Sequence, residues 1–320
     1  MNLFGRDMSS ILLHNFAASP FGEKVRLMLG LKHLTWQSVD AELIMPKPGL
    51  IALTGGYRKT PVMQIGADIY CDSRLIAEEL EKRHPFPSLF PGNSKGLCLG
   101  LSGWSDENFH TASSGLIIAV LKSTFPPDLM ADREKFFKGF IDVQNLEDEI
   151  PHLKVQLRAY ASLVEEQLSD GRAFWLGSEP SLADFHAYVE LWAARMHLPF
   201  AQDLLKAFHM MSEWEKRVKA IGHGERQEAG IAEAHDLARH SVPLPGAGID
   251  PEDTLGLIDE DIVTVTPADY GKDPVTGRLV TLTVREVAVA RDDPIAGQVV
   301  VHFPRIGYRV SCHMSPEIRR

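Results

Sequence analysis

The apolar positions of residues 11–84 follow the pattern of a small unit that mixes strands with helices. Short apolar runs predict strands at ILLHNF (11–16), LTWQSVD (34–40), PVMQI (61–65) and DIY (68–70). A helix is predicted directly after Ser19 and Pro20, a pair that suits the N-cap and the first turn. A loop is expected at MPKPG (45–49), and a last helix is expected to begin near Asp72.

Residues 95–230 carry long amphipathic helical patterns without strand patterns, so an all-helical domain is predicted behind the proline-rich linker HPFPSLFPGNSK (84–95). Its clearest helix begins at Ser181, which forms a capping box with Asp184. The residues expected to be buried in this helix and in a later one are Phe185, Val189, Trp192, Met196, Trp214 and Val218.

After a second linker, SVPLPGAGIDPEDTLG (241–256), the apolar period changes to two. The alternating apolar residues are Val263, Val265, Val280, Leu282, Val284, Val287, Val289, Val299, Val301 and Phe303. Turn patterns such as GKDPVTG (271–277) and RDDPIAG (291–297) separate them. Four or five short strands at this spacing predict a small all-β, barrel-like domain.

Length and charge narrow the function. A chain of 320 residues exceeds what one hydrophobic core usually serves, so two or three domains are expected. The formal charge of -10, from 33 basic and 43 acidic residues, disfavours nucleic acid or an anionic membrane as partner. From Ser241 onward there are 12 acidic and 8 basic residues, a net charge of -4, so nothing there favours nucleic acid either.

Cysteine and histidine spacing gives no sign of a metal site. Cys71, Cys98 and Cys312 lie far apart, without the paired spacing of zinc sites, redox dithiols or a disulfide framework. None of the 13 histidines falls in a metal-ligand motif, so no metal is expected. No window approaches the roughly 18 to 20 apolar residues that span a bilayer, so a cytoplasmic location is expected.

The stretch YRKTPVMQIGADIYCDS (57–73) opens a strand on Pro61, which cannot donate a ladder hydrogen bond. One interpretation is an edge proline that ends strand pairing. Together with the helical domain behind it, this stretch resembles the cytosolic glutathione transferases over roughly residues 10–230. The resemblance implies a cis bond between Thr60 and Pro61, which leaves the Thr60 main chain to pair with the cysteinyl main chain of glutathione.

The resemblance also implies residues for both ends of glutathione. Ser73 would hold the γ-glutamyl carboxylate at the start of a helix, where unpaired N–H groups and the dipole favour an anion. Asp72 stands where the family has a longer Glu or Gln that helps to hold the amino group. The alternative is that this pair only caps the helix. Lys59 matches a lysine that contacts the glycyl carboxylate in some plant transferases; the alternative is a solvated surface lysine.

The stretch NFAASPFGEKVRL (15–27) resembles the serine-type tau class, and the omega class with its cysteine replaced by serine. A Ser19 hydroxyl that donates to the glutathione sulfur would favour the thiolate of a thiol whose pKa is normally near 8.5. Ser19 as an ordinary N-cap is the other interpretation. Asn15, which stands where animal transferases carry a tyrosine, is an alternative partner for the sulfur. Mixed-disulfide chemistry of the omega type is not expected.

The family places its second substrate against the first helices of the helical domain. There GWSDENFH (103–110) offers Trp104, Phe109 and His110, and Phe21 lies just after Ser19 in the sequence. The alternative is that these aromatic side chains belong to the core.

Together these observations predict an α/β thioredoxin-like domain over 1–88, an all-helical transferase domain over 95–240 and a small β-barrel-like domain over 255–320. The predicted function is activation of the glutathione thiolate for attack on a small electrophile, with glutathione as co-substrate and detoxification as the role. The resemblance also implies a homodimer. The alternative is a non-catalytic binding or scaffold protein that uses the β domain as its interaction module.

Overall fold

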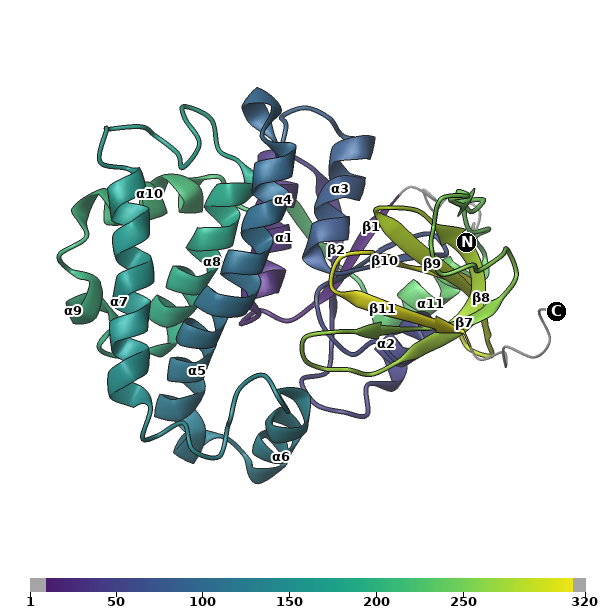
Figure 1. Cartoon of the computed structure of the whole chain (residues 1–320), viewed down its shortest axis with the longest axis horizontal. Coiled ribbons are helices and arrows are strands. Elements are labelled where there is room, and N and C mark those ends of the chain that lie inside the picture. The colour runs from purple at the N-terminus through teal and green to yellow at the C-terminus, as the bar shows by residue number, and fades with distance from the viewer. Residues whose placement is uncertain (1–9, 313–320) are drawn as a thin grey trace. The chain divides into compact units, whose positions relative to one another are not determined.

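The computed structural model describes residues 10–312 (Figure 1). Their contacts divide into two compact units. The first, which we call the sheet unit, comprises residues 10–16, 35–76 and 226–312. The second, which we call the helical unit, comprises residues 17–34 and 77–225. The sheet unit therefore combines the first strands of the chain with its last ones.

The sheet has 11 strands among the described residues. They are β1 (Ile11–Asn15), β2 (Thr35–Asp40), β3 (Val62–Ile65), β4 (Asp68–Cys71), β5 (Glu225–Glu228), β6 (Gly248–Ile249), β7 (Ile262–Pro267), β8 (Val275–Leu282), β9 (Glu286–Asp293), β10 (Gly297–Pro304) and β11 (Tyr308–Cys312). Their order is β11-β7-β8-β9-β10-β4-β3-β1-β2-β5, and β6 pairs with β8. β1 is parallel to β2 and antiparallel to β3, which is antiparallel to β4. The strands predicted from the first apolar runs are confirmed.

The strands predicted after residue 255 are confirmed as well, and they continue the first sheet. β10 runs parallel to β4, with Val301 aligned to Ile69. Both side chains are fully buried. Val284 was expected inside a strand, but it lies beyond the end of β8 and is 79% exposed.

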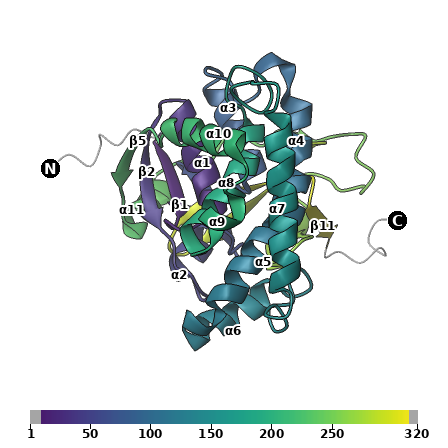
Figure 2. The ribbon, with the colours of Figure 1, turned by 90° about the vertical axis from the view of Figure 1, so that its left-hand side faces the viewer.

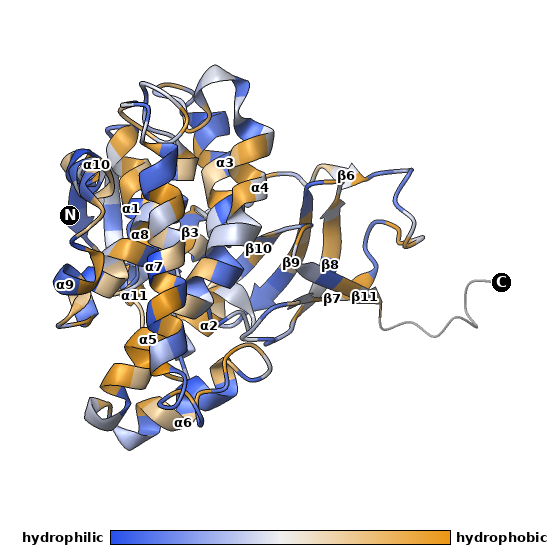
Figure 3. Ribbon diagram, turned by 60° about the vertical axis from the view of Figure 1, so that its left-hand side comes forward, coloured by the Kyte–Doolittle hydropathy of each residue, from blue (hydrophilic) through white to orange (hydrophobic). Residues whose placement is uncertain are grey.

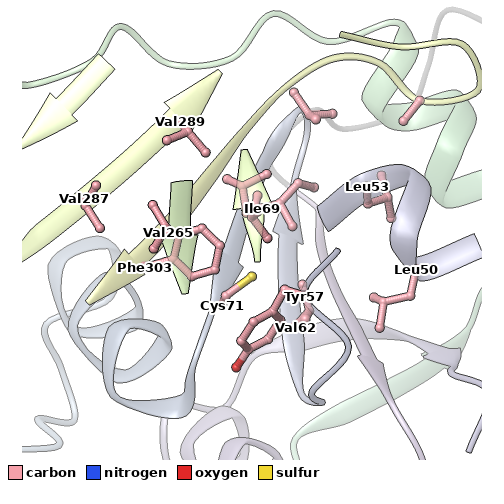
Figure 4. Packing of buried hydrophobic residues seen from close by; sticks show 14 of the residues in the cluster. Leu50, Leu53, Tyr57, Val62, Ile69, Cys71, Val265, Val287, Val289 and Phe303 are labelled. Carbon is pink, nitrogen blue, oxygen red and sulfur yellow. The ribbon is translucent and has the colours of Figure 1, made fainter. Parts of the chain in front are cut away.

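One apolar cluster fills the sheet unit and draws on both ends of its sequence. Leu50, Tyr57 and Ile69 from the early segments lie in the same cluster as Val265 and Phe303 from the late strands (Figure 4). The rings of Tyr57 and Phe303 meet edge to face, with centroids 5.7 Å apart. Because fully buried side chains of this size stabilise a fold by about 1.5–3 kcal/mol each, early and late segments depend on each other.

Two helices in the sheet unit are α2 (Pro48–Thr54) and α11 (Ile231–Arg239). α2 corrects the sequence analysis, which expected a loop to include its first residues. Pro48 occupies the first turn, and Gly55, with φ of 77°, ends the helix in the left-handed conformation that glycine adopts without strain. The Gly49 carbonyl oxygen lies 2.8 Å from His235 Nε2, which joins α2 to α11.

The elements of the helical unit include α1 (Pro20–Leu31), α4 (Lys95–Gly103), a π-helical segment (Trp104–Phe109), α5 (His110–Leu121), α6 (Pro127–Phe136), α7 (Ile150–Gln167), α8 (Leu182–His197), α9 (Ala201–Leu205) and α10 (His209–Ala220). A further helix, α3 (Ser73–Arg83), begins in the sheet unit and ends in the helical unit. α1 packs beside α8 (Figure 2). The second half of α5, GLIIAVL, is apolar (Figure 3).

α8 begins with the predicted capping box of Ser181 and Asp184. Phe185 and Val189 are fully buried as expected, but Met196 is 51% exposed, although Ala194 and Leu198 on either side of it are buried. β5 was not expected in this range. Its four residues, ERQE, are all polar and exposed, so the sequence shows no alternation of apolar and polar positions there. Among residues 10–312, no helix is both long enough and apolar enough to cross a membrane.

Candidate functional site

The bond between Thr60 and Pro61 is cis, as the resemblance implied. The antiparallel register of β3 and β4 pairs Val62 with Cys71, so the next residues outward, Pro61 and Asp72, flank the same end of this hairpin. Within residues 10–312 the Thr60 main chain has no hydrogen-bond partner. The turn therefore offers an unpaired main-chain edge beside the start of α3.

Asp72 acts as the N-cap of α3. Its Oδ1 accepts a hydrogen bond of 2.9 Å from the Arg74 N–H, and its carbonyl accepts one of 3.0 Å from Ile76 N–H. Its φ of 77° lies in the left-handed region, which aspartate tolerates better than most residues. Ser73, the first residue of α3, is only 5% exposed. The capping interpretation is thus met, and it leaves the helix N-terminus beside the cis turn.

The β region supplies a second contact to Asp72. The Tyr308 hydroxyl donates a 3.2 Å hydrogen bond to Asp72 Oδ2 and lies 3.3 Å from the Tyr57 hydroxyl. Burial, and then the nearby acidic groups, raise the pKa of both phenols well above the ordinary value. Tyr308 is therefore a neutral donor at physiological pH, and together with the Arg74 guanidinium, which lies 3.3 Å from Oδ2, it orients the Asp72 carboxylate.

Lys59 is not a solvated surface lysine. Its side chain is 12% exposed, its Nζ lies 2.6 Å from Asp269 Oδ1, and it stands 4.2 Å from the centroid of the Tyr270 ring. Burial lowers the pKa of the Lys59 ammonium below its ordinary value, and the Asp269 carboxylate partly opposes this. Lys59, the residue predicted to bind the glycyl carboxylate of glutathione, is therefore already held in an ion pair with Asp269 of the β region.

The Asn15 side chain donates two hydrogen bonds inside the sheet. It is 3% exposed, and its Nδ2 donates to the Leu13 carbonyl at 3.1 Å and to Ser38 Oγ at 3.2 Å. A primary amide has two N–H donors, and both have acceptors here. The side chain thus ties β1 to β2.

In the helical unit, Ser19 caps α1. Its Oγ accepts a 3.0 Å hydrogen bond from the Gly22 N–H, and its carbonyl accepts one of 2.8 Å from Glu23 N–H. Arg26 donates to the Ala17 carbonyl at 3.0 Å and so holds the loop before the helix. A serine hydroxyl accepts and donates at once, so the Ser19 hydrogen can be given to a ligand while the cap is kept.

The four aromatic residues predicted for the second-substrate wall separate into two groups. Phe21 is half-buried, and its ring lies 4.8 Å from that of His110. Trp104 instead packs on Phe109, at 5.4 Å, and Phe109 stacks on Tyr160 at 4.8 Å. Because Phe109 is fully buried, it fits the core alternative better than a pocket wall.

Charged groups that the sequence analysis did not single out surround Phe21 and His110. His110 Nδ1 lies 3.1 Å from Oε1 of Glu190, a fully buried carboxylate. The Lys24 ammonium stands 4.8 Å over the Phe21 ring and 2.5 Å from Asp106. Burial alone would raise the pKa of Asp106, but Lys24 and His186 together outweigh it and hold the pKa well below its usual range.

The contacts from the β region were also missed. Asp269, Tyr270 and Tyr308 reach Lys59 and Asp72 across more than two hundred residues of sequence. The only local sequence signal for these contacts is the pair Asp269 and Tyr270, an acidic residue followed by an aromatic one, just before the turn GKDPVTG (271–277). Within the described residues, no cluster of three or more His, Cys, Asp or Glu side chains is placed to hold a metal ion.

Comparison with known proteins finds two family models. That of the N-terminal domain of glutathione S-transferases matches residues 13–91, and that of the C-terminal domain matches residues 116–221. No curated protein is similar enough to be matched.

Among solved structures, a GST-like protein from Pseudomonas syringae is 35% identical, with a TM-score of 0.76, and the match covers 95% of this chain and 100% of that one. A glutathione S-transferase from Rhodospirillum rubrum is 21% identical, with a TM-score of 0.51, over 66% of this chain and 88% of that one. One from Pseudomonas fluorescens is 17% identical at the same TM-score, over 66% and 96%. A match over 95% of the chain must include most of the β region after residue 255, so the P. syringae protein shares that region.

Proposed function

The chain belongs to the glutathione S-transferase family, and we propose that it is a glutathione transferase of the serine type. The observation that carries the proposal is the end of the β3–β4 hairpin. There the cis turn leaves the Thr60 main chain unpaired, beside the N-terminus of α3 with Asp72 and Ser73. An extended peptide with a carboxylate at one end fits this combination of main-chain edge and helix N-terminus.

Ser19 is the residue that we assign to the sulfur. Its hydroxyl oxygen already accepts from Gly22, so its hydrogen is the group left to donate to a thiolate. Each unit by which the thiol pKa falls corresponds to about 1.4 kcal/mol of preferential binding of the thiolate. Asn15 is the weaker candidate because both of its amide hydrogens have acceptors inside the sheet.

The reaction that we propose is nucleophilic attack on a small electrophile. The thiolate sulfur forms a bond to an electrophilic carbon, and the leaving group departs with the bonding electron pair. The protein contributes positioning and electrostatic stabilisation. Phe21 and His110, which lie in contact in the helical unit, are the proposed aromatic part of the second-substrate site. Trp104 and Phe109 support that wall from the aromatic cluster behind it.

Calorimetric titration with glutathione tests the proposal. The wild-type protein is expected to bind glutathione and to lower the pKa of the bound thiol, as read from thiolate absorbance against pH. Ser19→Ala should raise that pKa by about one unit, and by the same linkage it should weaken glutathione binding by up to about tenfold at a pH where the wild-type bound thiol is ionised. Asn15→Ala is the matched comparison and should leave the thiol pKa unchanged. Absence of any glutathione binding by the wild type would sink the proposal.

A second function is favoured by the way the β region enters the site. Asp269 and Tyr308 contact Lys59 and Asp72, two of the residues proposed to bind glutathione. Such contacts are compatible with a protein that binds glutathione without catalysing its reaction. Binding of glutathione with no turnover on a panel of electrophiles would support this scaffold function instead of the transferase. The family resemblance also leads us to propose a homodimer in the cytoplasm. Sedimentation of the purified chain and fractionation of cells test these two points.

A further inference from the structure

One end of the β7–β11 strand pair lies against the proposed thiol site of the sheet unit. Tyr308, at the start of β11, is in register with Pro267 at the end of β7. Asp269 follows two residues later, and the Ala268 N–H donates to the Gly307 carbonyl at 2.9 Å, which holds this loop on β11. Tyr308 on β11 and Asp269 in the loop after β7 therefore lie at the same end of this strand pair.

These side chains reach both sides of the cis turn. Tyr308 donates to Asp72, which follows β4, and Asp269 pairs with Lys59, which precedes the turn. The two contacts are separate interactions of different chemistry. The β region is thus in direct contact with the groups proposed to hold the two ends of glutathione.

The contact at Lys59 changes the charge that a ligand meets. A lone ammonium would present one positive charge to the glycyl carboxylate of glutathione. Here Asp269, 34% exposed, lies 2.6 Å from the ammonium, and the Tyr270 ring covers another side. A carboxylate that approaches Lys59 therefore meets a pair with no net charge, and Asp269 repels it at close range.

A ligand group without charge meets no such repulsion. A glycyl amide or ester keeps a carbonyl oxygen that accepts a hydrogen bond from Lys59, which has three N–H donors and only one carboxylate partner in the described structure. The Lys59–Asp269 pair does not need to open for such a ligand.

We propose that Asp269 is a specificity-determining residue of this site, and that the site takes a glutathione-type thiol whose glycyl carboxyl group is neutral, as an amide or ester, in preference to free glutathione. This inference rests on the proposed function, because it deepens the assignment of Lys59 and the cis turn to a thiol peptide.

The test compares two ligands on three proteins by calorimetry at pH 7. The ligands are glutathione and its glycyl ethyl ester. The proteins are the wild type, Asp269→Asn and Asp273→Asn. Asp273 lies in the same loop and makes no described contact with Lys59, so its variant removes the same charge as a matched control. The asparagine at position 269 keeps a hydrogen-bond acceptor for Lys59 and so preserves the packing.

The wild type is expected to bind the ester at least as tightly as glutathione. Asp269→Asn should tighten the binding of glutathione about five- to tenfold, leave the ester within about twofold, and so reverse the preference. Asp273→Asn should keep the wild-type ratio. The gain should shrink in 0.5 M salt, because Asp269 is partly exposed and salt screens its charge.

The outcomes separate the two hypotheses. If the wild type prefers glutathione, or if Asp269→Asn changes both affinities by the same factor, Asp269 has at most a structural role and this inference is overturned while the proposed function stands. If the wild type binds neither thiol, the proposed function fails and this inference fails with it.

Discussion

Replacing His302 with glutamine should weaken the sheet unit, because this imidazole joins three strands. Its Nδ1 lies 2.6 Å from Glu286 Oε1 on β9, and its Nε2 lies 3.0 Å from Asp68 Oδ1 on β4. The ring also stacks on Tyr70, with centroids 4.6 Å apart. Burial alone would lower the pKa of His302, but the two carboxylates outweigh it and raise the pKa above the ordinary value.

The geometry sets the size of the effect. Hydrogen bonds to charged groups stabilise by about 1.5–3 kcal/mol each. Removing one partner of a buried charge pair costs about 3–5 kcal/mol. Asp68 is nearly buried, whereas Glu286 is 29% exposed and contributes less. We therefore expect His302→Gln to lower the free energy of unfolding by about 3 kcal/mol at pH 6.

The pH dependence has a definite sign. The pKa of an unfolded histidine is about 6.5, and the folded value is raised. The stabilisation is therefore fully present below the unfolded pKa and is lost as pH rises through the folded pKa. The difference in unfolding free energy between the wild type and His302→Gln should thus be largest at pH 6 and should decrease towards pH 9.

Urea unfolding followed by circular dichroism at pH 6, 7.5 and 9 measures this difference. Hydrogen exchange of the β10 amides should localise the loss to the sheet unit. His152→Gln, at an exposed position of α7, is the control and should change little at any pH. A difference that is independent of pH, or that grows towards pH 9, would refute a protonated His302 between the two carboxylates.

Two further predictions concern the helical unit. Lys24→Met should lower the free energy of unfolding by about 3–5 kcal/mol in a urea titration, because it leaves the Asp106 carboxylate without its closest cation. Lys206→Met removes a lysine whose side chain is 72% exposed and should lower the free energy of unfolding by at most about 1 kcal/mol. Equal losses in the two variants would contradict the assignment of Lys24 as the partner of the Asp106 carboxylate. Gly30→Ala should destabilise by about 1–3 kcal/mol in a thermal melt, because an added Cβ would lie 2.0 Å from a main-chain carbonyl oxygen after α10. Gly103→Ala, with nothing within 4 Å of the added carbon, should leave the melting temperature unchanged or raise it. A larger loss of stability in Gly103→Ala than in Gly30→Ala would contradict the close contact at Gly30.

The elements that the sequence predicted correctly are those with local physical signals. The Ser19–Pro20 pair begins α1, and the capping box of Ser181 and Asp184 begins α8, because the groups that satisfy a helix N-terminus lie within three residues of it. α2 was missed because its seven residues are too few to show a helical period. Met196 was assigned to the buried stripe by spacing alone, and spacing does not show which positions of a stripe the neighbouring elements cover.

The contacts of the β region were out of reach for a different reason. Strand alternation shows which residues face a core, and the alternation of Val299, Val301 and Phe303 is the same whether β10 closes a separate barrel or joins another sheet. The choice depends on the register between Val301 and Ile69, which lie 232 positions apart. The cis bond at Pro61 was implied by the family resemblance of the residues around it, whereas the partners of Lys59 and Asp72 lie more than two hundred residues away and gave no such signal.

The pairing of β10 with β4 bears on whether the β region can act as a detachable module. Without it, β4 would be the edge of the early strands and would expose a row of unpaired N–H and C=O groups. Ile69 and Tyr57 would also lose apolar neighbours such as Val301 and Phe303. Removing the β region would therefore damage the same segment that holds the cis turn, and would release Lys59 and Asp72 from Asp269 and Tyr308 at the same moment. A truncated chain cannot test the β region apart from the thiol site, so point variants such as Asp269→Asn, which leave the β10–β4 pairing intact, are the informative experiments.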